Sequence, residues 1–130
     1  MAANILVVDD SAAIRKILQR VLHQTAMSIG TIFEAGDGLE AVESLKANPI
    51  HLLLSDINMP KMDGLQLLAA IKANPQWKSI PVVMITTEGG EAKVAEAVRL
   101  GAGGYVRKPF TADQIKEKLS GLVETAGVAL

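Results

Sequence analysis

The fold is decided by the central stretch Leu52-Leu-Leu-Ser-Asp56, where three leucines lead directly into a serine and an aspartate. An uninterrupted apolar run of strand length is typical of a parallel strand that helices cover on both faces. Residues 5–8 and 82–85 form two more runs of this kind. We expect these three strands to occupy the centre of one parallel sheet.

Two weaker strands and five amphipathic helices are predicted around this centre. Residues 29–33 and 104–106 contain glycine, which suits edge strands, so we place them outside the other three. Apolar residues recur at helical spacing between the strands, and Thr111 and Gln114 form a predicted capping box before the last helix. The predicted helices cover residues 14–22, 39–45, 65–71, 94–98 and 111–122.

Strands that alternate with helices predict a doubly wound α/β domain. Two weak edges around three strong strands fit the order 2-1-3-4-5, so we expect a (βα)5 flavodoxin-like sandwich with a five-stranded parallel sheet. The 130 residues suffice for one domain over 1–130, with a core from about residue 4 to 124 and no output domain. Ligands of such sheets bind beyond the carboxyl ends of the strands, here between strands one and three, where the chain order reverses.

The composition excludes several classes of function. A net charge of -1 provides no basic surface for nucleic acid or for an anionic membrane. The absence of cysteine excludes disulfides, thiolate catalysis and cysteine-based metal sites. The chain reaches Asp9 and Asp10 too early for a signal peptide, and no apolar run approaches the ~20 residues of a membrane span, so we expect a cytoplasmic protein.

Polar side chains follow the predicted strands at the functional edge of the sheet. Asp9 and Asp10 follow the first strand, and Asp56 ends the third. Thr86 follows the apolar run of the fourth strand, and Lys108 follows the fifth. Carboxylates this close raise one another's pKa unless a cation lies among them, and Mg²⁺ prefers such oxygen ligands. Protein-bound Mg²⁺ usually takes one or two carboxylates and a phosphate oxygen among its ligands. We therefore expect a site for a phosphoryl group.

Several of these residues also have a purely structural interpretation. Taken alone, Asp9 and Asp10 could simply turn the chain, although Ser11 is the better cap for the first helix. Asp63 is interpreted as the N-terminal cap of the third helix and is left out of the site. Asp56 is the exception, because a carboxylate directly after a buried strand is unfavourable without a partner.

Four segments carry the polar residues of this edge: Val7-Val-Asp-Asp10, Ser55-Asp-Ile-Asn-Met-Pro-Lys-Met-Asp-Gly64, Ile85-Thr86 and Gly104-Tyr-Val-Arg-Lys-Pro-Phe110. Together they resemble the response-regulator receiver domains of two-component signalling systems, most closely the single-domain chemotaxis regulators of that family. Their order at successive strand ends makes the combination specific, and the likeness spans almost the whole chain.

The resemblance implies a role for each residue at this edge. Asp56 would accept the phosphoryl group. Asp10 would bind Mg²⁺ directly, Asp9 would bind it through water, and Asn58 would bind it through its backbone carbonyl. Lys108 would contact a phosphoryl oxygen, aimed inward by a cis bond to the following proline. The implied activity is self-catalysed phosphoryl transfer to Asp56 and autodephosphorylation, which is switching and not enzymatic metabolism.

The resemblance also implies a conformational output and partners. The Thr86 hydroxyl would move toward the phosphoryl group, and Tyr105 would enter the space that it leaves. The surface of the fourth helix, fifth strand and fifth helix would then bind a downstream target, for which a flagellar motor switch is one candidate. A histidine kinase would be the phosphodonor, and we expect a monomer that binds neither nucleic acid nor membrane.

Three further residues are expected to set the phosphoryl lifetime. Asn58 and Glu88 flank the path of the hydrolytic water in the family. Thr87 stands where a smaller alanine is common, and its branched side chain is expected to slow uptake or loss of the phosphoryl group. Residues 90–93 replace the lysine-rich stretch of enteric chemotaxis regulators, which argues against motor-switch binding.

Other functions remain as alternatives at this stage. The protein could be a single-domain receiver in a phosphorelay outside chemotaxis. An FMN carrier on the same fold is disfavoured by acids in place of a hydroxyl-rich phosphate loop and by an aromatic content of only 3%. A phosphatase with an aspartyl-phosphate intermediate would need an acid where Asn58 stands. An adaptor without chemistry is the remaining class, and failure to bind Mg²⁺ would favour it.

Overall fold

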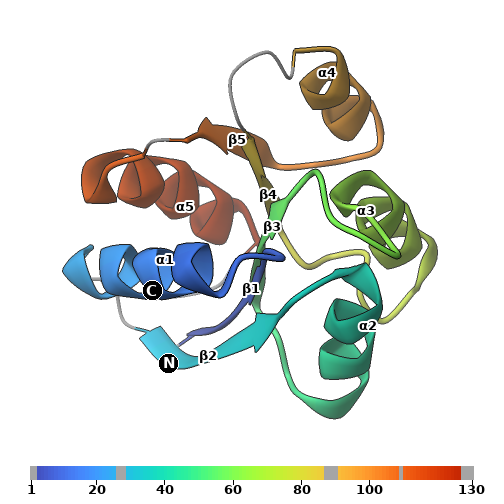
Figure 1. Cartoon of the computed structure of the whole chain (residues 1–130), viewed down its shortest axis with the longest axis horizontal. Helices are drawn as coiled ribbons and strands as arrows, with labels where there is room; N and C mark the ends of the chain where they lie inside the picture. The colour runs from blue at the N-terminus through green and yellow to red at the C-terminus, as the bar shows by residue number, and fades with distance from the viewer. Residues whose placement is uncertain (1–2, 26–28, 87–90, 109, 127–130) are drawn as a thin grey trace.

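The computed structural model describes residues 3–25, 29–86, 91–108 and 110–126, in which five strands alternate with five helices (Figure 1). The strands are β1 (Ala3–Val8), β2 (Ile29–Ala35), β3 (Leu52–Asp56), β4 (Val82–Thr86) and β5 (Gly104–Arg107). The helices are α1 (Ala12–Gln24), α2 (Gly38–Ala47), α3 (Gly64–Ala73), α4 (Glu91–Arg99) and α5 (Ala112–Ala126). Each predicted element is present, with ends that differ by a few residues. Within the described ranges, no helix is both long and apolar enough to cross a membrane.

The strands form one parallel sheet in the order β2-β1-β3-β4-β5. The predicted order and the central position of the three apolar strands are thereby confirmed. Every residue of β3 is buried, whereas the edge strands β2 and β5 include exposed residues. The central strand lacks a polar face because helices cover both sides of it.

Side chains of each strand alternate between two hydrophobic layers. Leu6 and Val8 of β1 pack in the layer covered by α2, α3 and α4, while Ile5 and Val7 pack in the layer covered by α1 and α5. Figure 1 shows α1 and α5 on one side of the sheet and the other three helices on the opposite side. Because both faces are closed in this way, the carboxyl ends of the strands are left as the place for polar chemistry.

Polar side chains cap three helices where sequence predicts them. The Ser11 hydroxyl accepts a hydrogen bond from the backbone N–H of Ile14 at the start of α1, at 3.3 Å. Asp63 and Gln66 form a reciprocal capping box at the start of α3, with bonds of 2.8 and 3.0 Å. Thr111 and Gln114 bond in the same reciprocal way before α5, at 3.0 and 3.2 Å. These bonds satisfy backbone N–H groups that have no partner within the helix.

Gly64 allows α3 to begin directly against the end of β3. Its backbone N–H donates to the carbonyl of Ile57 at 2.8 Å. A Cβ atom at position 64 would lie 2.2 Å from the carbonyl oxygen of Asp56. Two such atoms cannot approach so closely, so a residue with a side chain would push the backbone of Asp56 out of place. The position of Asp56 therefore depends on a glycine later in the chain.

Gly64→Ala is expected to destabilise the protein by about 2 kcal/mol, because overpacking at this site must displace backbone atoms. Gly104→Ala is the matched control, since a Cβ there meets nothing nearer than Lys118 Cδ at 3.9 Å, and its effect should stay within about 0.5 kcal/mol. Urea unfolding followed by circular dichroism measures both free energies. Equal effects of the two substitutions would contradict the requirement for glycine at position 64.

Candidate functional site

The strand register brings the predicted polar residues to one edge of the sheet. Val8 of β1 lies beside Ser55 of β3, so Asp9 and Asp56, each one residue further on, are neighbours. Lys108 is the residue directly after β5. Since the carboxyl ends of parallel strands meet at the same edge, residues from three distant segments of the chain can converge there.

Asp9, Asp10 and Asp56 form a compact acidic cluster. One carboxylate oxygen from each residue lies within 4.8 Å of the others. Asp9 is 1% exposed and Asp56 is 8% exposed, while Asp10 is open to solvent. Two of the three carboxylates are thus buried, and the third is open to solvent.

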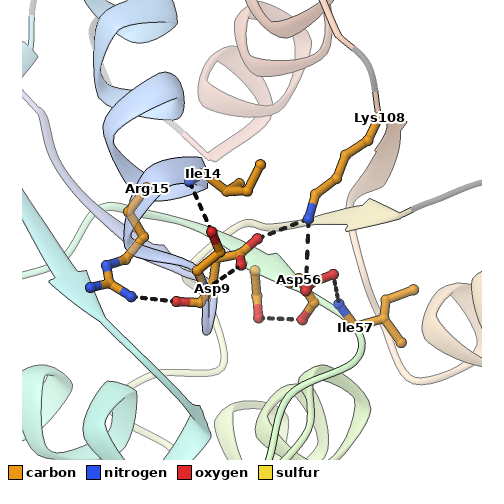
Figure 2. A network of polar contacts seen from close by, with 8 residues as sticks. Asp9, Ile14, Arg15, Asp56, Ile57 and Lys108 are labelled. Carbon is orange, nitrogen blue, oxygen red and sulfur yellow. Dashed lines mark hydrogen bonds and ion pairs between the residues drawn. The ribbon is translucent and has the colours of Figure 1, made fainter.

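Lys108 is the cation that faces this cluster (Figure 2). Its Nζ atom donates a hydrogen bond to Oδ2 of Asp9 at 2.9 Å and lies 3.8 Å from Oδ2 of Asp56. The lysine side chain is only 18% exposed. Lys108 therefore points inward and does not occupy the solvated position that a lone surface lysine would have.

Asp9 combines the structural and the functional interpretations that the sequence left open. Its Oδ1 accepts a hydrogen bond from the backbone N–H of Ser11 at 2.9 Å, while Oδ2 binds Lys108. Asp9 thus turns the chain into α1 together with the Ser11 cap, and it also belongs to the acidic cluster.

The environment of Asp56 makes its ionised form unfavourable. Burial raises the pKa of Asp56 above the ordinary value of 3.8, and the charges of Asp9 and Asp10 raise it further. Lys108 and the backbone N–H of Ile57, which donates to Oδ1 of Asp56 at 2.8 Å, act in the opposite direction. The net effect is a raised pKa, and burial is the largest contribution to it.

This donor set fits a hard divalent cation. Carboxylate oxygens on short side chains are the ligands that Mg²⁺ prefers, and no soft ligand is present in the cluster. Three carboxylates face the ammonium group of Lys108 there, so negative charge is in excess before an ion binds. Asp9, Asp10 and Asp56 are the residues that could hold such an ion.

Arg15 supports the site, and sequence reasoning did not select it. Its Nη1 donates to the backbone carbonyl of Asp9 at 2.6 Å, and its Nε pairs with Glu34 on β2 at 3.0 Å (Figure 2 shows the first contact). Arg15 therefore ties the start of α1 to the ends of β1 and β2. Nothing in the sequence distinguishes it from Lys16 and Arg20 on the same helix.

The predicted switch residues lie on β4 and β5. Thr86 ends β4 at the functional edge, but its side chain is outside the described part of the structure. Tyr105 on β5 is 38% exposed, with Lys118 Nζ 5.7 Å from the centre of its ring. The arrangement shown thus has Tyr105 at the surface.

Of the residues predicted to set the phosphoryl lifetime, Asn58 alone is described. Its side chain is exposed, and its amide oxygen accepts a hydrogen bond from Lys93 of α4. Thr87 and Glu88 lie outside the described residues, as does Pro109, whose bond to Lys108 is expected to be cis.

Comparisons with known proteins point in the same direction as the geometry. The response regulator receiver domain family matches residues 5–120. Chemotaxis protein CheY1 of Helicobacter pylori strain J99 is 43% identical over 123 residues, which cover 94% of this chain and 98% of that protein. The chemotaxis protein CheY homolog of Campylobacter jejuni strain 81-176 is 39% identical, covering 94% and 93%. The structure of the chemotaxis response regulator CheY4 of Vibrio cholerae matches with a TM-score of 0.83 at 31% identity, covering 94% and 99%.

Asp56→Asn is expected to stabilise the protein by about 1 kcal/mol at neutral pH in metal-free buffer. Because folding raises the pKa of Asp56, the carboxylate opposes folding at every pH above that raised value. The penalty fades as the pH falls toward the value of the unfolded chain. Asparagine keeps an oxygen that can accept the Ile57 bond. Urea unfolding at neutral pH and near about pH 4.5 should show a difference that shrinks on acidification.

Glu43→Gln is the control for this stability measurement. Glu43 is an exposed carboxylate on α2 that pairs with Lys46 at 3.4 Å. Its substitution should change the free energy of unfolding by less than about 0.5 kcal/mol at either pH. A loss of stability in Asp56→Asn at neutral pH would mean that Lys108 outweighs burial and the neighbouring acids.

Proposed function

Since the chain belongs to the response regulator receiver domain family, we propose that it is a phosphorylation-activated switch that accepts a phosphoryl group on Asp56. The observation that carries this proposal is the setting of Asp56 at the end of the central strand. Carboxylate oxygens of Asp9 and Asp10 lie within 4.8 Å of it, and Lys108 Nζ lies at 3.8 Å. Receiver domains act in signalling and are not classical enzymes.

Asp56 would act as the nucleophile through one defined oxygen. Its Oδ1 is engaged by the backbone N–H of Ile57 at 2.8 Å, whereas Oδ2 faces Lys108 at the longer distance of 3.8 Å. Attack of Oδ2 on the phosphorus of the donor forms an acyl phosphate, and the donor group leaves with the electrons of its bond to phosphorus. Most of the catalysis in such a transfer is positioning and charge compensation.

Asp9, Asp10 and Asp56 would hold the Mg²⁺ ion, together with the backbone carbonyl of Asn58. When bound, Mg²⁺ neutralises the repulsion between the carboxylate nucleophile and the negative phosphoryl oxygens. Asp9 also keeps its bond to the Ser11 backbone, so its carboxylate is oriented before any ligand arrives.

Lys108 would compensate the charge of the phosphoryl group. In the described arrangement it bonds Asp9 and lies just beyond hydrogen-bond distance of Asp56. A phosphoryl oxygen on Asp56 would give the ammonium group a second acceptor on the side that it already faces. The inward aim of Lys108 supports this role.

Chemotaxis is the proposed pathway because relatives at 39% and 43% identity are chemotaxis proteins. A histidine kinase would supply the phosphoryl group, in the cytoplasm. The target would bind the surface formed by α4, β5 and α5, on which Tyr105 is exposed. Thr86 would drive the inward movement of Tyr105, and Asn58, Thr87 and Glu88 would set how long the active state lasts.

Incubation with acetyl phosphate tests the phosphoacceptor. The wild type should gain about 80 Da, the mass of one phosphoryl group, only when Mg²⁺ is present, and Asp56→Asn should gain nothing. Intact-mass spectrometry after a short incubation measures both. Asp113→Asn is the matched control, because Asp113 is an exposed carboxylate on α5, and it should gain the same mass as the wild type. Equal labelling of Asp56→Asn and the wild type would overturn the assignment.

Lys108→Arg tests whether the cation must be a compact ammonium group. The planar, forked guanidinium is larger and cannot reproduce the contacts to Asp9 and Asp56 from the same backbone position. We expect phosphoryl uptake from acetyl phosphate to slow by about tenfold while the protein stays folded. Lys46→Arg, at an exposed lysine in the last turn of α2, should leave the rate unchanged. An unchanged rate in Lys108→Arg would show that any cation suffices.

A further inference from the structure

Helix α4 contacts the loop after Asp56 through a side-chain hydrogen bond. Lys93, in the first turns of α4, donates from Nζ to the amide oxygen of Asn58, although 35 residues separate the two in sequence. Asn58 follows Asp56 by two residues, so its Cα lies no more than about 7.6 Å from that of Asp56. The bond thus connects α4 to the rim of the acidic cluster.

The remainder of the loop between β3 and α3 is held mainly by its backbone. The Ile57 carbonyl accepts from the N–H of Gly64 at 2.8 Å, and the Met62 carbonyl accepts from the N–H of Gly38 at 3.0 Å. In the described part of the chain, Lys93 is the one hydrogen-bond partner of the exposed Asn58 side chain. The backbone of this loop is therefore fixed by α2 and α3, whereas the Asn58 side chain is positioned by α4.

Helix α4 is itself only weakly anchored. Among residues 92–99 of this helix, Ala97 alone is buried, whereas α3 buries Gly64, Leu67, Leu68 and Ile71. In Figure 1, α4 lies at the end of its layer, beyond α3. A helix with few buried contacts has low local stability, so one additional bond has a large share in holding it.

We propose that Lys93 is a positioning residue of the phosphorylation site, which holds the Asn58 side chain beside the acidic cluster and limits the access of water to the acyl phosphate. This inference rests on the proposed function of Asp56. In hydrolysis, water attacks the phosphorus, the bond from phosphorus to the Asp56 oxygen breaks, and the carboxylate and inorganic phosphate are released. Without Lys93, the Asn58 side chain moves freely and water reaches the phosphorus more often.

The lifetime of the phosphorylated protein is the direct readout. Lys93→Met removes the donor but keeps most of the length of the side chain, and it should shorten the lifetime by about three- to tenfold, the scale of one typical intramolecular hydrogen bond. Lys93→Arg retains a donor and should remain close to the wild type. Lys46→Met removes an exposed lysine on α2 and is the control for charge alone. An unchanged or longer lifetime in Lys93→Met overturns the proposal.

A double-substitution cycle tests whether Lys93 acts through Asn58. Lifetimes are compared for Asn58→Ala with and without Lys93→Met. In the Asn58→Ala background the loss of Lys93 should change the lifetime by less than about twofold, because the partner is already absent. If Lys93→Met shortens the lifetime equally in both backgrounds, Lys93 acts by its charge and the positioning role is overturned.

Hydrogen exchange on the unphosphorylated protein tests the contact without relying on the proposed function. Backbone amides of α4 should exchange faster in Lys93→Met than in Lys46→Met, because the bond that ties the helix to Asn58 is lost. Equal exchange in the two variants would show that Lys93 does not tether the helix. If the wild type takes up no phosphoryl group, the proposed function and the lifetime claim are both overturned. The exchange result still tests whether Lys93 holds α4 through its bond to Asn58.

Discussion

Negative charge confined at the carboxyl edge of the sheet is the constraint on which the rest of this receiver domain depends. Three carboxylates lie within 4.8 Å of one another, and burial and mutual repulsion raise the pKa of Asp56. Lys108 compensates part of this charge across 99 residues of sequence. The acidic cluster lowers the free energy of unfolding. The two hydrophobic layers on the sheet must offset this loss, because burial of apolar side chains is the dominant favourable contribution to folding. A cluster of this kind favours a bound cation, which relieves the repulsion between its carboxylates.

The site and the surface of α4 and β5 differ in how firmly the fold holds them. Asp9 and Asp56 stand at the ends of buried central strands, and Gly64 locks the start of α3 against β3. These parts give the chemistry a rigid frame, as precise positioning requires. The surface of α4 and β5 is different, since α4 buries little and Tyr105 is exposed. Elements of low local stability are the ones that a small change in contacts can move.

The position of the acidic residues could be predicted from the sequence, because it depends on strand patterning and on hydrogen bonds between near neighbours in the chain. Short uninterrupted apolar runs that alternate with helical patterns are typical of strands covered on both faces, and the parallel direction of such strands brings their carboxyl ends to one edge. Asp56, directly after Leu54 and Ser55, must then lie at that edge beside Asp9. The caps at Ser11 and Asp63 were equally predictable, because each depends on hydrogen bonds within a few residues.

What the sequence by itself determined is the order of the elements, the edge of the sheet that carries the chemistry, and the residue types available there. Local periodicity and local hydrogen bonds encode these features, so they can be read without knowing what packs on what. Only the tertiary structure decided that Asp9 serves both Ser11 and Lys108, that Arg15 holds the Asp9 backbone, and that Lys93 reaches Asn58. Those contacts join long side chains from separate helices and strands. Their partners are chosen by the way whole elements dock, and no short stretch of sequence carries that information.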